Sequence, residues 1–472
     1  MSFETVLQGQ VSRLVVVSNR VTPISGSKAQ TAGGLAVGIL ASLRETGGIW
    51  FGWSGEQSDA AAPMPKVFRT GNLTYITIDL TPRAFDGYYG GFANRTLWPL
   101  FHYRLDLASF DRDWYLAYRQ VNQLFAEQLY PYLRDDDLVW VHDYHLIPRG
   151  EELRKLGVKC RIGFFLHIPF PSTEVYVALP WHDHLLRALC AYDLLGFQTS
   201  NDLRNFHDYL YREGTGYALA DGLIHAFGST LRAQEFPIGI DADDFAAMAT
   251  SAEAVRASQR LSRSLSGRRL IIGVDRLDYT KGITERLRSF EALLQSYPRQ
   301  RGQVTFVQIS APSREEVPEY LELRGQVEAT SGRINGRFSE FDWTPLRYLN
   351  RGFSRRTLSG FFRLSRIGLV TPLRDGMNLV AKEYVAAQSD EDPGVLVLSR
   401  FAGAADDLDG AVIVNPYDIE AVAEAMHFGL TMPLDERQDR WRRLFAQIQQ
   451  HDIAHWRRDF VDALAQNDPP ES

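Results

Sequence analysis

The sequence predicts an α/β protein built from two Rossmann-like, doubly wound domains, and three observations support this fold class. The chain has 472 residues, more than one hydrophobic core usually serves, so two domains of ordinary size are expected. Short runs rich in β-branched residues recur along it, and each is followed by a turn and a helical pattern. The runs are almost continuously apolar, as strands of a parallel sheet covered on both faces must be.

The predicted strands fall into two sets separated by a break in the pattern. They are residues 14–18, 138–142, 162–167 and 194–198 in the first set, and 270–275, 304–310, 367–371, 395–399 and 411–415 in the second. Pro237 and Gly239 interrupt the pattern between the sets. We therefore predict domains at 1–241 and 242–455. The remaining residues, 456–472, are predicted as the closing helix and tail. This helix (IAHWRRDFVDALAQ) is amphipathic, and its periodicity leaves open whether it packs back on the first domain.

Composition and charge indicate a soluble enzyme. The 51 basic and 58 acidic side chains give a net charge of −7, which argues against nucleic acid or an anionic membrane as the main partner. The two cysteines lack the spacing of a metal site, and a disulfide framework is not expected. The N-terminus lacks the features of a signal peptide, and the longest apolar runs are strand-sized. We predict a cytoplasmic protein with no membrane span.

Ligands of open α/β sheets bind beyond the carboxyl ends of the strands, so residues that follow each strand are the first candidates. Arg20 ends the sequence SNR after the first strand, and its planar guanidinium suits a phosphate; a surface salt bridge is the alternative. Gly33 and Gly34 open the stretch AGGLAVGIL, where a helix start would direct N–H groups at an anion. Helix-starting glycines are common, so these two carry less weight.

Large aromatic side chains mark a candidate sugar site. Trp53 lies in FGWSGE, and Tyr89 and Trp98 lie in YYGGFANRTLWPLFHYR, both predicted as glycine-containing loops. Such side chains pack against sugar faces and donate hydrogen bonds. Core packing is the alternative, and it is favoured for any one of them taken alone.

Histidines follow two of the predicted strands. His142 and His145 flank Asp143 but lack a third protein ligand nearby, so no metal site is predicted there. We interpret Asp143 as an acceptor of hydrogen bonds from sugar hydroxyls. His167 precedes a rigid loop with two prolines, and it either donates to a sugar hydroxyl or is a satisfied interior histidine. The acidic triple at 135–137 precedes its strand, and we interpret it as a solvated turn.

The second domain carries candidate phosphate ligands. Arg276 and Lys281 lie in VDRLDYTKGI directly after a predicted strand, so two cations can converge on one diphosphate. Neutralising the leaving phosphate lowers the barrier for breaking a glycosidic phosphate bond. Arg314 follows the next strand and is a further candidate. A structural salt bridge is the alternative for each of the three.

The segment TPLRDGMNLVAKE combines a strand end, a turn and a helix start. Asp375 lies in the turn, and Glu383 lies about two helical turns further if the helix begins near Asn378. Backbone N–H groups of Asn378, Leu379 and Val380 would then face a phosphate. Asp375 would hold sugar hydroxyls, and Glu383 would accept from both ribose hydroxyls. An ordinary helical glutamate is the alternative, but it does not explain why all these residues share one placement.

The ordered motifs resemble those of the trehalose-6-phosphate synthase family, which are retaining glycosyltransferases. The resemblance covers almost the full length and depends on VSNR, AGGLAVG, FGWSGE, LWPLFHYR, HDYHL, GFFLHIPFP, RLDYTKG, GRING and TPLRDGMNLVAKE. It implies the GT-B arrangement, in which two Rossmann-like domains face each other across a cleft.

The resemblance also implies a role for each candidate residue. The implied acceptor-binding residues, for glucose-6-phosphate, are Arg20, Trp53, Tyr89, Trp98, Asp143 and Arg314. The implied donor-binding residues are Gly33, Gly34, Arg276, Lys281, Phe353, Asp375, Gly376, Met377, Asn378, Leu379, Val380 and Glu383. The implied catalytic residues are Arg276, Lys281, His167 and Asp375.

The implied reaction is glucosyl transfer from a nucleotide-glucose, by default UDP-glucose, to glucose-6-phosphate. The products are α,α-trehalose-6-phosphate and a nucleoside diphosphate, and front-face attack retains the α configuration. Neither a metal nor a cofactor is expected, because Arg276 and Lys281 supply the positive charge.

Other functions stay open at this point. One is a pseudo-glycosyltransferase that couples a nucleotide-linked cyclitol to an amino-cyclitol phosphate, and another is a non-catalytic regulatory subunit of a synthase complex. A dinucleotide-dependent dehydrogenase is disfavoured, because no G-x-G-x-x-G follows the first strand. The sequence does not decide the donor nucleotide or the oligomeric state, for which a homo-oligomer is the default.

Overall fold

The computed structural model describes residues 12–21, 43, 47–59, 64–219, 222–314 and 317–466. Contacts divide the chain into two compact units. Unit 1 comprises Met1–Gly26, Leu35–Phe236 and Arg457–Ser472, and unit 2 comprises Ser27–Gly34 and Pro237–Trp456. Among the described residues, no helix is long and apolar enough to span a bilayer.

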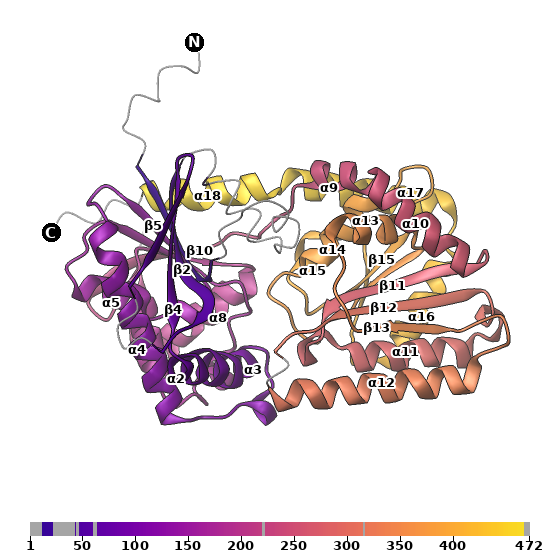
Figure 1. The fold of residues 1–472 in the computed structure, drawn as a ribbon, viewed down its shortest axis with the longest axis horizontal. Coiled ribbons are helices and arrows are strands. Elements are labelled where there is room, and N and C mark those ends of the chain that lie inside the picture. Colours follow the sequence, from indigo (N-terminus) through magenta and orange to yellow (C-terminus); the bar gives the residue numbers. More distant parts are fainter. Residues whose placement is uncertain are drawn as a thin grey trace, which may run out of the picture. The chain divides into compact units, whose positions relative to one another are not determined.

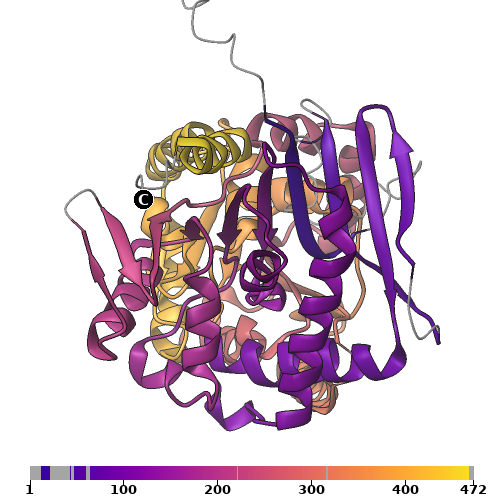
Figure 2. The same ribbon diagram turned by 90° about the vertical axis from the view of Figure 1, so that its left-hand side faces the viewer.

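Unit 1 contains a ten-stranded sheet with the order β3-β4-β2-β1-β5-β6-β7-β10-β9-β8. Figure 1 draws this part of the chain in indigo to magenta. Its strands are β1 (Leu14–Arg20), β2 (Gly48–Gln57), β3 (Lys66–Thr70), β4 (Leu73–Leu80), β5 (Leu138–His142), β6 (Arg161–Phe165), β7 (Leu194–Phe197), β8 (Gly216–Ala218), β9 (Leu223–Ala226) and β10 (Ser229–Glu235). The strands from β4 to β10 in this order are parallel. Antiparallel hairpins extend the two edges, as Figure 2 shows.

Helices of unit 1 connect these strands. They are α2 (Pro82–Ala84), the π-helical η2 (Phe85–Leu97), α3 (Trp98–Phe101), η3 (Leu105–Leu107), α4 (Arg112–Leu129), η4 (Tyr130–Tyr132), η5 (Tyr144–Leu146), α5 (Arg149–Lys155), α6 (Thr173–Tyr176), α7 (His182–Leu189), α8 (Ser200–Arg212) and the end of α18 (Ile453–Gln466).

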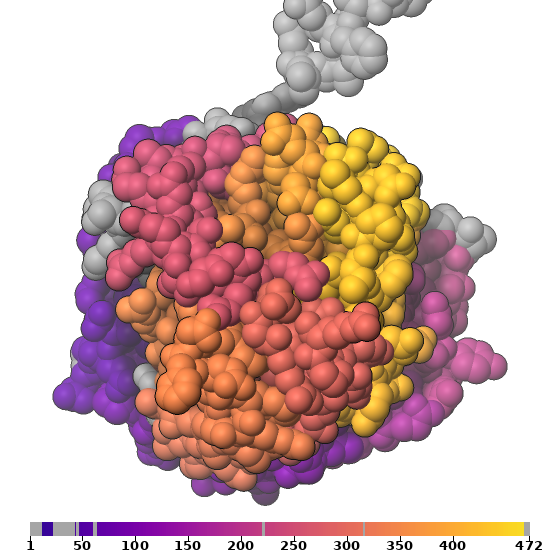
Figure 3. All heavy atoms as spheres, turned by 90° about the vertical axis from the view of Figure 1, so that its right-hand side faces the viewer, coloured from indigo at the N-terminus to yellow at the C-terminus, as the bar shows by residue number. Residues whose placement is uncertain are grey.

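Unit 2 contains a six-stranded, fully parallel sheet with the order β13-β12-β11-β14-β15-β16. Its strands are β11 (Arg269–Arg276), β12 (Val304–Ala311), β13 (Leu346–Leu349), β14 (Ile367–Val370), β15 (Val395–Ser399) and β16 (Val412–Val414). Its helices are α9 (Ala242–Ala249), α10 (Ala252–Leu265), η6 (Tyr279–Lys281), α11 (Ile283–Ser296), η7 (Pro298–Gln300), α12 (Pro318–Phe338), α13 (Arg355–Leu364), α14 (Leu379–Ala387), α15 (Ala404–Asp407), α16 (Ile419–Thr431) and α17 (Leu434–Gln450). On the face seen in Figure 3, the segment around residue 260 (pink) and the C-terminal segments (yellow) both reach the surface.

The order of the parallel strands reverses once in each unit. In unit 1 the chain leads outward from β1 through β2 to β4, and then from β5 in the opposite direction. In unit 2 the same reversal separates β11 from β14. Open α/β sheets bind ligands at such a switch point, beyond the carboxyl ends of the strands. The switch points therefore direct attention to residues after β1 and β5 in unit 1, and after β11 and β14 in unit 2.

All the strands predicted from apolar runs are present, as β1, β5, β6, β7, β11, β12, β14, β15 and β16. The prediction of loops around the aromatic residues was wrong. Trp53 lies in β2, Tyr89 in η2 and Trp98 in α3. Packing explains the strand: a Cβ at Gly52 would lie 2.1 Å from the carbonyl oxygen of Ser18, so the glycine permits close strand contact instead of a turn.

The closing helix α18 is amphipathic, as predicted. Its buried side chains Trp456, Phe460 and Leu464 recur at a helical spacing. The Phe460 ring stacks on Trp140 of β5, with 4.6 Å between ring centroids. The part of α18 that belongs to unit 1 therefore covers one face of that sheet, which Figure 2 shows with the helix in yellow.

The packing of Phe460 gives a stability prediction. Phe460→Ala should lower the free energy of unfolding by about 3–5 kcal/mol, because a fully buried ring is replaced by a cavity. Urea unfolding followed by tryptophan fluorescence measures the loss. Arg458→Ala, an exposed change in the same helix, is the control and should shift stability by less than about 0.5 kcal/mol. Equal losses in the two variants would contradict this account of α18.

Candidate active site

The switch point of unit 2 brings together Lys281 and Asp375. Lys281 ends η6 after β11, and Asp375 lies in the turn after β14. The Lys281 Nζ and Asp375 Oδ2 atoms lie 2.6 Å apart, and both side chains are largely buried. Asn378 Nδ2 donates to the same Asp375 oxygen at 3.0 Å. A cation, a carboxylate and an amide therefore lie within one small polar cluster.

A buried arginine holds this cluster in place. The Arg286 side chain in α11 donates to the Asp275 carboxylate at the end of β11 and to Gln308 Oε1 of β12. Its Nε donates to Thr371 Oγ1 after β14 at 2.9 Å, and its Nη2 donates to the Lys281 carbonyl oxygen at 3.1 Å. One guanidinium thus ties three neighbouring strand ends to the loop that carries Lys281.

Close packing requires a glycine directly after Lys281. Gly282 has φ +63°, and a Cβ there would lie 2.4 Å from the Thr371 carbonyl oxygen. A side chain at this position would therefore push the Lys281 loop away from the end of β14. The sequence T-K-G is explained by this approach of two strand ends.

Arg276 and Arg314 lie near a buried aspartate in unit 2. Arg276 is exposed at the end of β11. The Arg314 guanidinium is buried, lies 3.1 Å from Asp278 Oδ2 and also contacts the Tyr320 hydroxyl. Burial alone would raise the pKa of Asp278, but Arg314, Arg276 and Lys281 outweigh it and lower that pKa to about 2. Asp278 is thus an anion that interacts with three cations.

The predicted helix start after Asp375 is present. Helix α14 begins at Leu379, and Asn378 occupies its N-cap with φ +78°. No described side chain caps this start. Backbone hydrogen bonds to Phe401 and from Ala404 fix the turn that contains Gly376 and Met377. The turn is therefore rigid, and the helix start keeps its capacity to bind an anion.

Glu383 and Phe353 lie further along the same region of unit 2. Arg355 Nη2 donates to Glu383 Oε1 at 3.1 Å. Burial raises the pKa of Glu383, and Arg355 opposes this effect. Phe353 is half-buried, packs edge-on against Phe361 and has the Arg351 guanidinium 4.5 Å above its ring.

In unit 1 the aromatic candidates form a continuous set with the HDYHL segment. Trp53 lies 5.8 Å from Tyr89, and Tyr89 stacks on His145 at 5.8 Å. His145 contacts Tyr144, which in turn contacts Trp98. Both tryptophans are 5 % exposed, so much of each ring serves packing. The structure therefore supports core packing for these rings.

Arg20 lies against this aromatic set. Its guanidinium carbon is 5.7 Å from the centre of the Trp53 ring. Gly55, with φ +91°, leaves room for it, because a Cβ at that position would lie 2.6 Å from Arg20 Nε. Tyr88 donates to Asn19 Oδ1 at 2.8 Å and so links η2 to the SNR segment.

Asp143 and His142 both hold His167. Asp143 adopts φ +78°, and its Oδ1 accepts from the His167 backbone N–H at 3.2 Å. The ring atoms His142 Nδ1 and His167 Nε2 lie 3.0 Å apart. Burial lowers the pKa of His167 to about 3 and also lowers the pKa of His142, so both rings are neutral at physiological pH. One ring must donate to the other, which fixes complementary tautomers.

Sequence reasoning did not identify several residues that organise these clusters. Asp278 and Arg355 are ionic partners of the predicted residues Arg314 and Glu383, and the buried Arg286 donates to the carbonyl oxygen of Lys281. Asp278 lies inside the RLDYTKG motif, whereas a helical arginine such as Arg286 gives no sequence signal of burial. The predicted residues Gly33 and Gly34 lie outside the described residues. Within the described part of the chain, no three His, Cys, Asp or Glu side chains are arranged to hold a metal ion.

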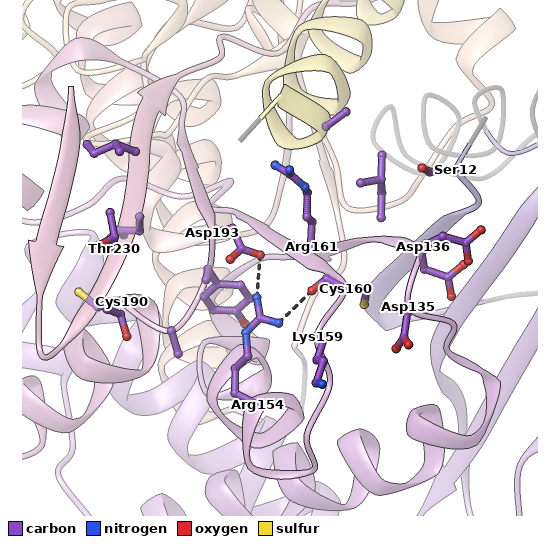
Figure 4. Close-up of a pocket in the computed structure, with 18 residues that line it drawn as sticks. Ser12, Asp135, Asp136, Arg154, Lys159, Cys160, Arg161, Cys190, Asp193 and Thr230 are labelled. Carbon is purple, nitrogen blue, oxygen red and sulfur yellow. Dashed lines mark hydrogen bonds and ion pairs between the residues drawn. The ribbon is translucent and has the colours of Figure 1, made fainter. Parts of the chain in front are cut away.

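A cavity of about 730 Å³ lies at the opposite, amino-terminal edge of the sheet of unit 1 (Figure 4). Asp135 and Asp136 line it and are exposed, as expected for a solvated turn. The same interpretation was wrong for Asp137, which is buried and lies 2.7 Å from Arg13 Nη2. Arg154, another lining residue, is bonded to Asp193 and to backbone carbonyls. These pairs are structural.

The fold and these clusters define a two-domain α/β enzyme with polar sites at the strand-order switch points. The model of glycosyltransferase family 20 matches residues 11–466, and the chain belongs to that family. The trehalose-6-phosphate synthase of Sinorhizobium fredii is 51 % identical over 456 residues, covering 96 % of this chain and 98 % of the relative. That of Enterobacter sp. is 49 % identical over 460 residues, covering 97 % and 96 %.

Solved structures agree with this assignment. A UDP-forming α,α-trehalose-phosphate synthase from Burkholderia xenovorans, in complex with glucose-6-phosphate, has a TM-score of 0.92 and 53 % identity, covering 96 % of this chain and all of that one. A structure from E. coli, bound with UDP-2-fluoro glucose, has a TM-score of 0.92 and 49 % identity, covering 96 % and 99 %. The predicted family resemblance and α/β fold class are confirmed.

The lowered pKa of Asp278 gives a pH prediction. A carboxyl group with a pKa of about 2 in the folded state, against about 3.9 when unfolded, contributes about 2–3 kcal/mol of stability at pH values above the unfolded pKa. That contribution should be lost as the pH falls from about 4 towards 2. Asp278→Asn should therefore be destabilised at pH 7 and show a flatter acid-unfolding curve. Asp390→Asn, at an exposed position, should leave the curve unchanged.

Proposed function

We propose that the protein transfers glucose from UDP-glucose to glucose-6-phosphate, with retention, giving α,α-trehalose-6-phosphate and UDP. Membership of glycosyltransferase family 20 supports the class of reaction. The relatives and neighbours described above as UDP-forming synthases, or as bound to glucose-6-phosphate and a UDP-glucose analogue, support these substrates. They support this reaction over a cyclitol-coupling or a regulatory role.

The observation that carries the proposal is the contact between Lys281 and Asp375. A cation suited to a phosphate and a carboxylate suited to sugar hydroxyls lie 2.6 Å apart at the switch point of unit 2. A nucleotide sugar presents its phosphate and its glucose on either side of one glycosidic oxygen. Lys281 and Asp375 are therefore suited to bind the two groups on either side of the bond that breaks.

The donor is assigned to unit 2. Arg276 and Lys281 hold the diphosphate, and the start of α14 directs backbone N–H groups at it. Asp375 holds glucose hydroxyls, Glu383 holds the ribose, and Phe353 lies near the base. Gly33 and Gly34 are proposed to approach the donor phosphate through their backbone.

The acceptor is assigned mainly to unit 1. Arg20 and Tyr89 bind the phosphate of glucose-6-phosphate, with Arg314 of unit 2 as a further ligand. Trp53, Trp98 and Asp143 shape the sugar site. His167 is held neutral by burial, its ring is oriented by His142, and its backbone N–H donates to Asp143; it is assigned to glucose of the donor.

The mechanism needs no protein nucleophile. The acceptor hydroxyl attacks the anomeric carbon on the face from which the diphosphate leaves, and its proton passes to the leaving phosphate oxygen. Arg276 and Lys281 neutralise the charge that develops on that phosphate. We propose that no metal or cofactor is required, that the protein acts in the cytoplasm, and that it forms homo-oligomers.

One assay tests this function. The protein is incubated with glucose-6-phosphate and UDP-, GDP- or ADP-glucose, with a chelator present and with added Mg²⁺ in parallel. Release of UDP together with a non-reducing disaccharide phosphate, unaffected by the chelator, is the expected result. If no donor gives that product, the proposed function is wrong. Activity that depends on added Mg²⁺ would refute only the metal-independent mechanism.

Arg276 gives the sharpest mutational prediction. Arg276→Ala should lower kcat by at least about 100-fold, because charge stabilisation of a leaving group is lost in the transition state. The fold should survive, since Arg276 is exposed at the end of β11. Steady-state kinetics and thermal unfolding measure the two effects. Arg288→Ala, an exposed change on α11, is the control, and near-normal kcat in Arg276→Ala would exclude the assigned role.

Gly55 gives a prediction for the acceptor site. Gly55→Ala should raise KM for glucose-6-phosphate by about tenfold, because the new Cβ displaces the Arg20 guanidinium and weakens its contact with the phosphate. Gly71→Ala is a matched control: Gly71 also has a positive φ, but no atom lies within 4 Å of the place that a Cβ would take there. A similar KM in both variants would contradict the assignment of Arg20 to the phosphate of glucose-6-phosphate.

A further inference from the structure

Arg355 and Glu383 form an ion pair in unit 2. We propose that Arg355 is a positioning residue that keeps the Glu383 carboxylate ionised and oriented, so that it can accept hydrogen bonds from the ribose of the donor. The inference rests on the proposed function, in which Glu383 holds the ribose. Arg355 itself is not assigned a contact with the substrate.

The geometry leaves one oxygen of Glu383 for a ligand. Arg355 Nη2 contacts Oε1 at 3.1 Å, and no described group makes a hydrogen bond to Oε2. The Arg355 guanidinium is itself fixed, because its central carbon lies 5.2 Å from the Phe245 ring centre in α9. A fixed cation on one oxygen orients the other, which is the requirement for a carboxylate that receives a diol.

The position of Arg355 in its own helix supports a role for the pair. Arg355 is the first residue of α13, whose N-cap is Ser354. A cation at a helix N-terminus is unfavourable, because the helix dipole places partial positive charge there. Arg355 therefore does not stabilise α13 through its charge. Its contact with Glu383 is the interaction that accounts for a cation at this place.

Other charged groups near α14 interact with groups other than Glu383. Helix α14 packs against α9, α13, α15 and α17. Asp407 of α15 pairs with Lys382, whose Nζ also donates to the Ile238 carbonyl oxygen. Of α9, Asp243 accepts from Gln449, and Asp244 is near the start of its helix. Helix α17 contributes the neutral Trp441, which donates to the Val385 carbonyl oxygen. Among the described residues, Arg355 is the ionic partner of Glu383.

Electrostatics predict the result of removing Arg355. Burial raises the pKa of Glu383, and Arg355 is the group that opposes this. Without Arg355 the pKa of Glu383 rises further, so more of the carboxyl group is protonated at neutral pH. A protonated carboxyl group loses acceptor capacity. Affinity for a ribose is then low at neutral pH and returns as the pH rises and the carboxylate forms.

The experiment measures UDP and 2′-deoxy-UDP binding by calorimetry between pH 7 and 9, and every variant is compared with a control at the same pH because the nucleotide itself ionises in this range. The variants are Arg355→Met, Arg355→Lys and Glu383→Gln. Arg356→Met is the matched control, because Arg356 is the next residue in α13 and is exposed. Each affinity is divided by that of the control at the same pH, which removes effects common to all variants.

Four results are expected. Arg355→Met binds UDP about tenfold more weakly at pH 7, and the loss shrinks towards pH 9. Arg355→Lys stays within about threefold of the wild type, because a cation is retained. The preference of the wild type for UDP over 2′-deoxy-UDP is largely lost in Arg355→Met at pH 7. Glu383→Gln is weak at every pH, because it cannot regain a carboxylate.

Two outcomes would overturn the inference. One is unchanged UDP affinity in Arg355→Met. The other is a loss that is the same at pH 7 and pH 9 and the same for both nucleotides, which indicates a merely structural role. Failure of the proposed function is distinguishable: the wild type would then form no disaccharide phosphate, whatever the behaviour of Arg355→Met. A wild type that is active beside an unaffected Arg355→Met would refute this inference alone.

Discussion

The Arg286 guanidinium is the interaction on which the switch point of unit 2 depends. It is almost completely buried, and a buried charge is tolerated only if it is paired and its donors are satisfied. Asp275, Gln308, Thr371 and the Lys281 carbonyl oxygen provide those acceptors. Two of the partners lie in the adjacent strands β11 and β12, one directly follows β14 and one lies in η6, so satisfying a single side chain also fixes the relative positions of these segments.

Precise placement of Lys281 and Asp375 follows from this constraint. Both residues lie on connections, where backbone position is usually less well defined than in a strand. Arg286 anchors one connection directly, and the tight contact at Gly282 holds it against Thr371, close to the turn of Asp375. Catalytic groups that are already in position lose less entropy when a substrate binds. The rigidity of the two strand ends is thus the physical basis for assigning a reaction to them.

The sequence predicted those parts of the molecule in which local pattern and tertiary role agree. Apolar runs such as LVWVH are buried on both faces, so they identified β5 and its equivalents. β2 was missed because its glycines suggest a loop, although Gly52 serves close contact with β1. At the site, Lys281 and Asp375 were predicted as ligands from their place after strands. Their contact with each other, and the role of Arg286, depend on residues far apart in sequence and could not be predicted from spacing.

Most of the charged residues assigned to ligands in unit 2 share a further property: they already have a partner of opposite charge. Lys281 pairs with Asp375, Arg314 with Asp278, and Glu383 with Arg355. These side chains are largely buried, and an unpaired charge there would cost several kcal/mol. Internal pairing offsets that cost. Under the proposed function, a diphosphate that reaches Lys281 exchanges one ionic partner for another, and Asp375 becomes available to sugar hydroxyls. Under the proposed function, the Lys281–Asp375 pair would therefore favour a ligand that carries both a phosphate and a sugar over one that carries either alone.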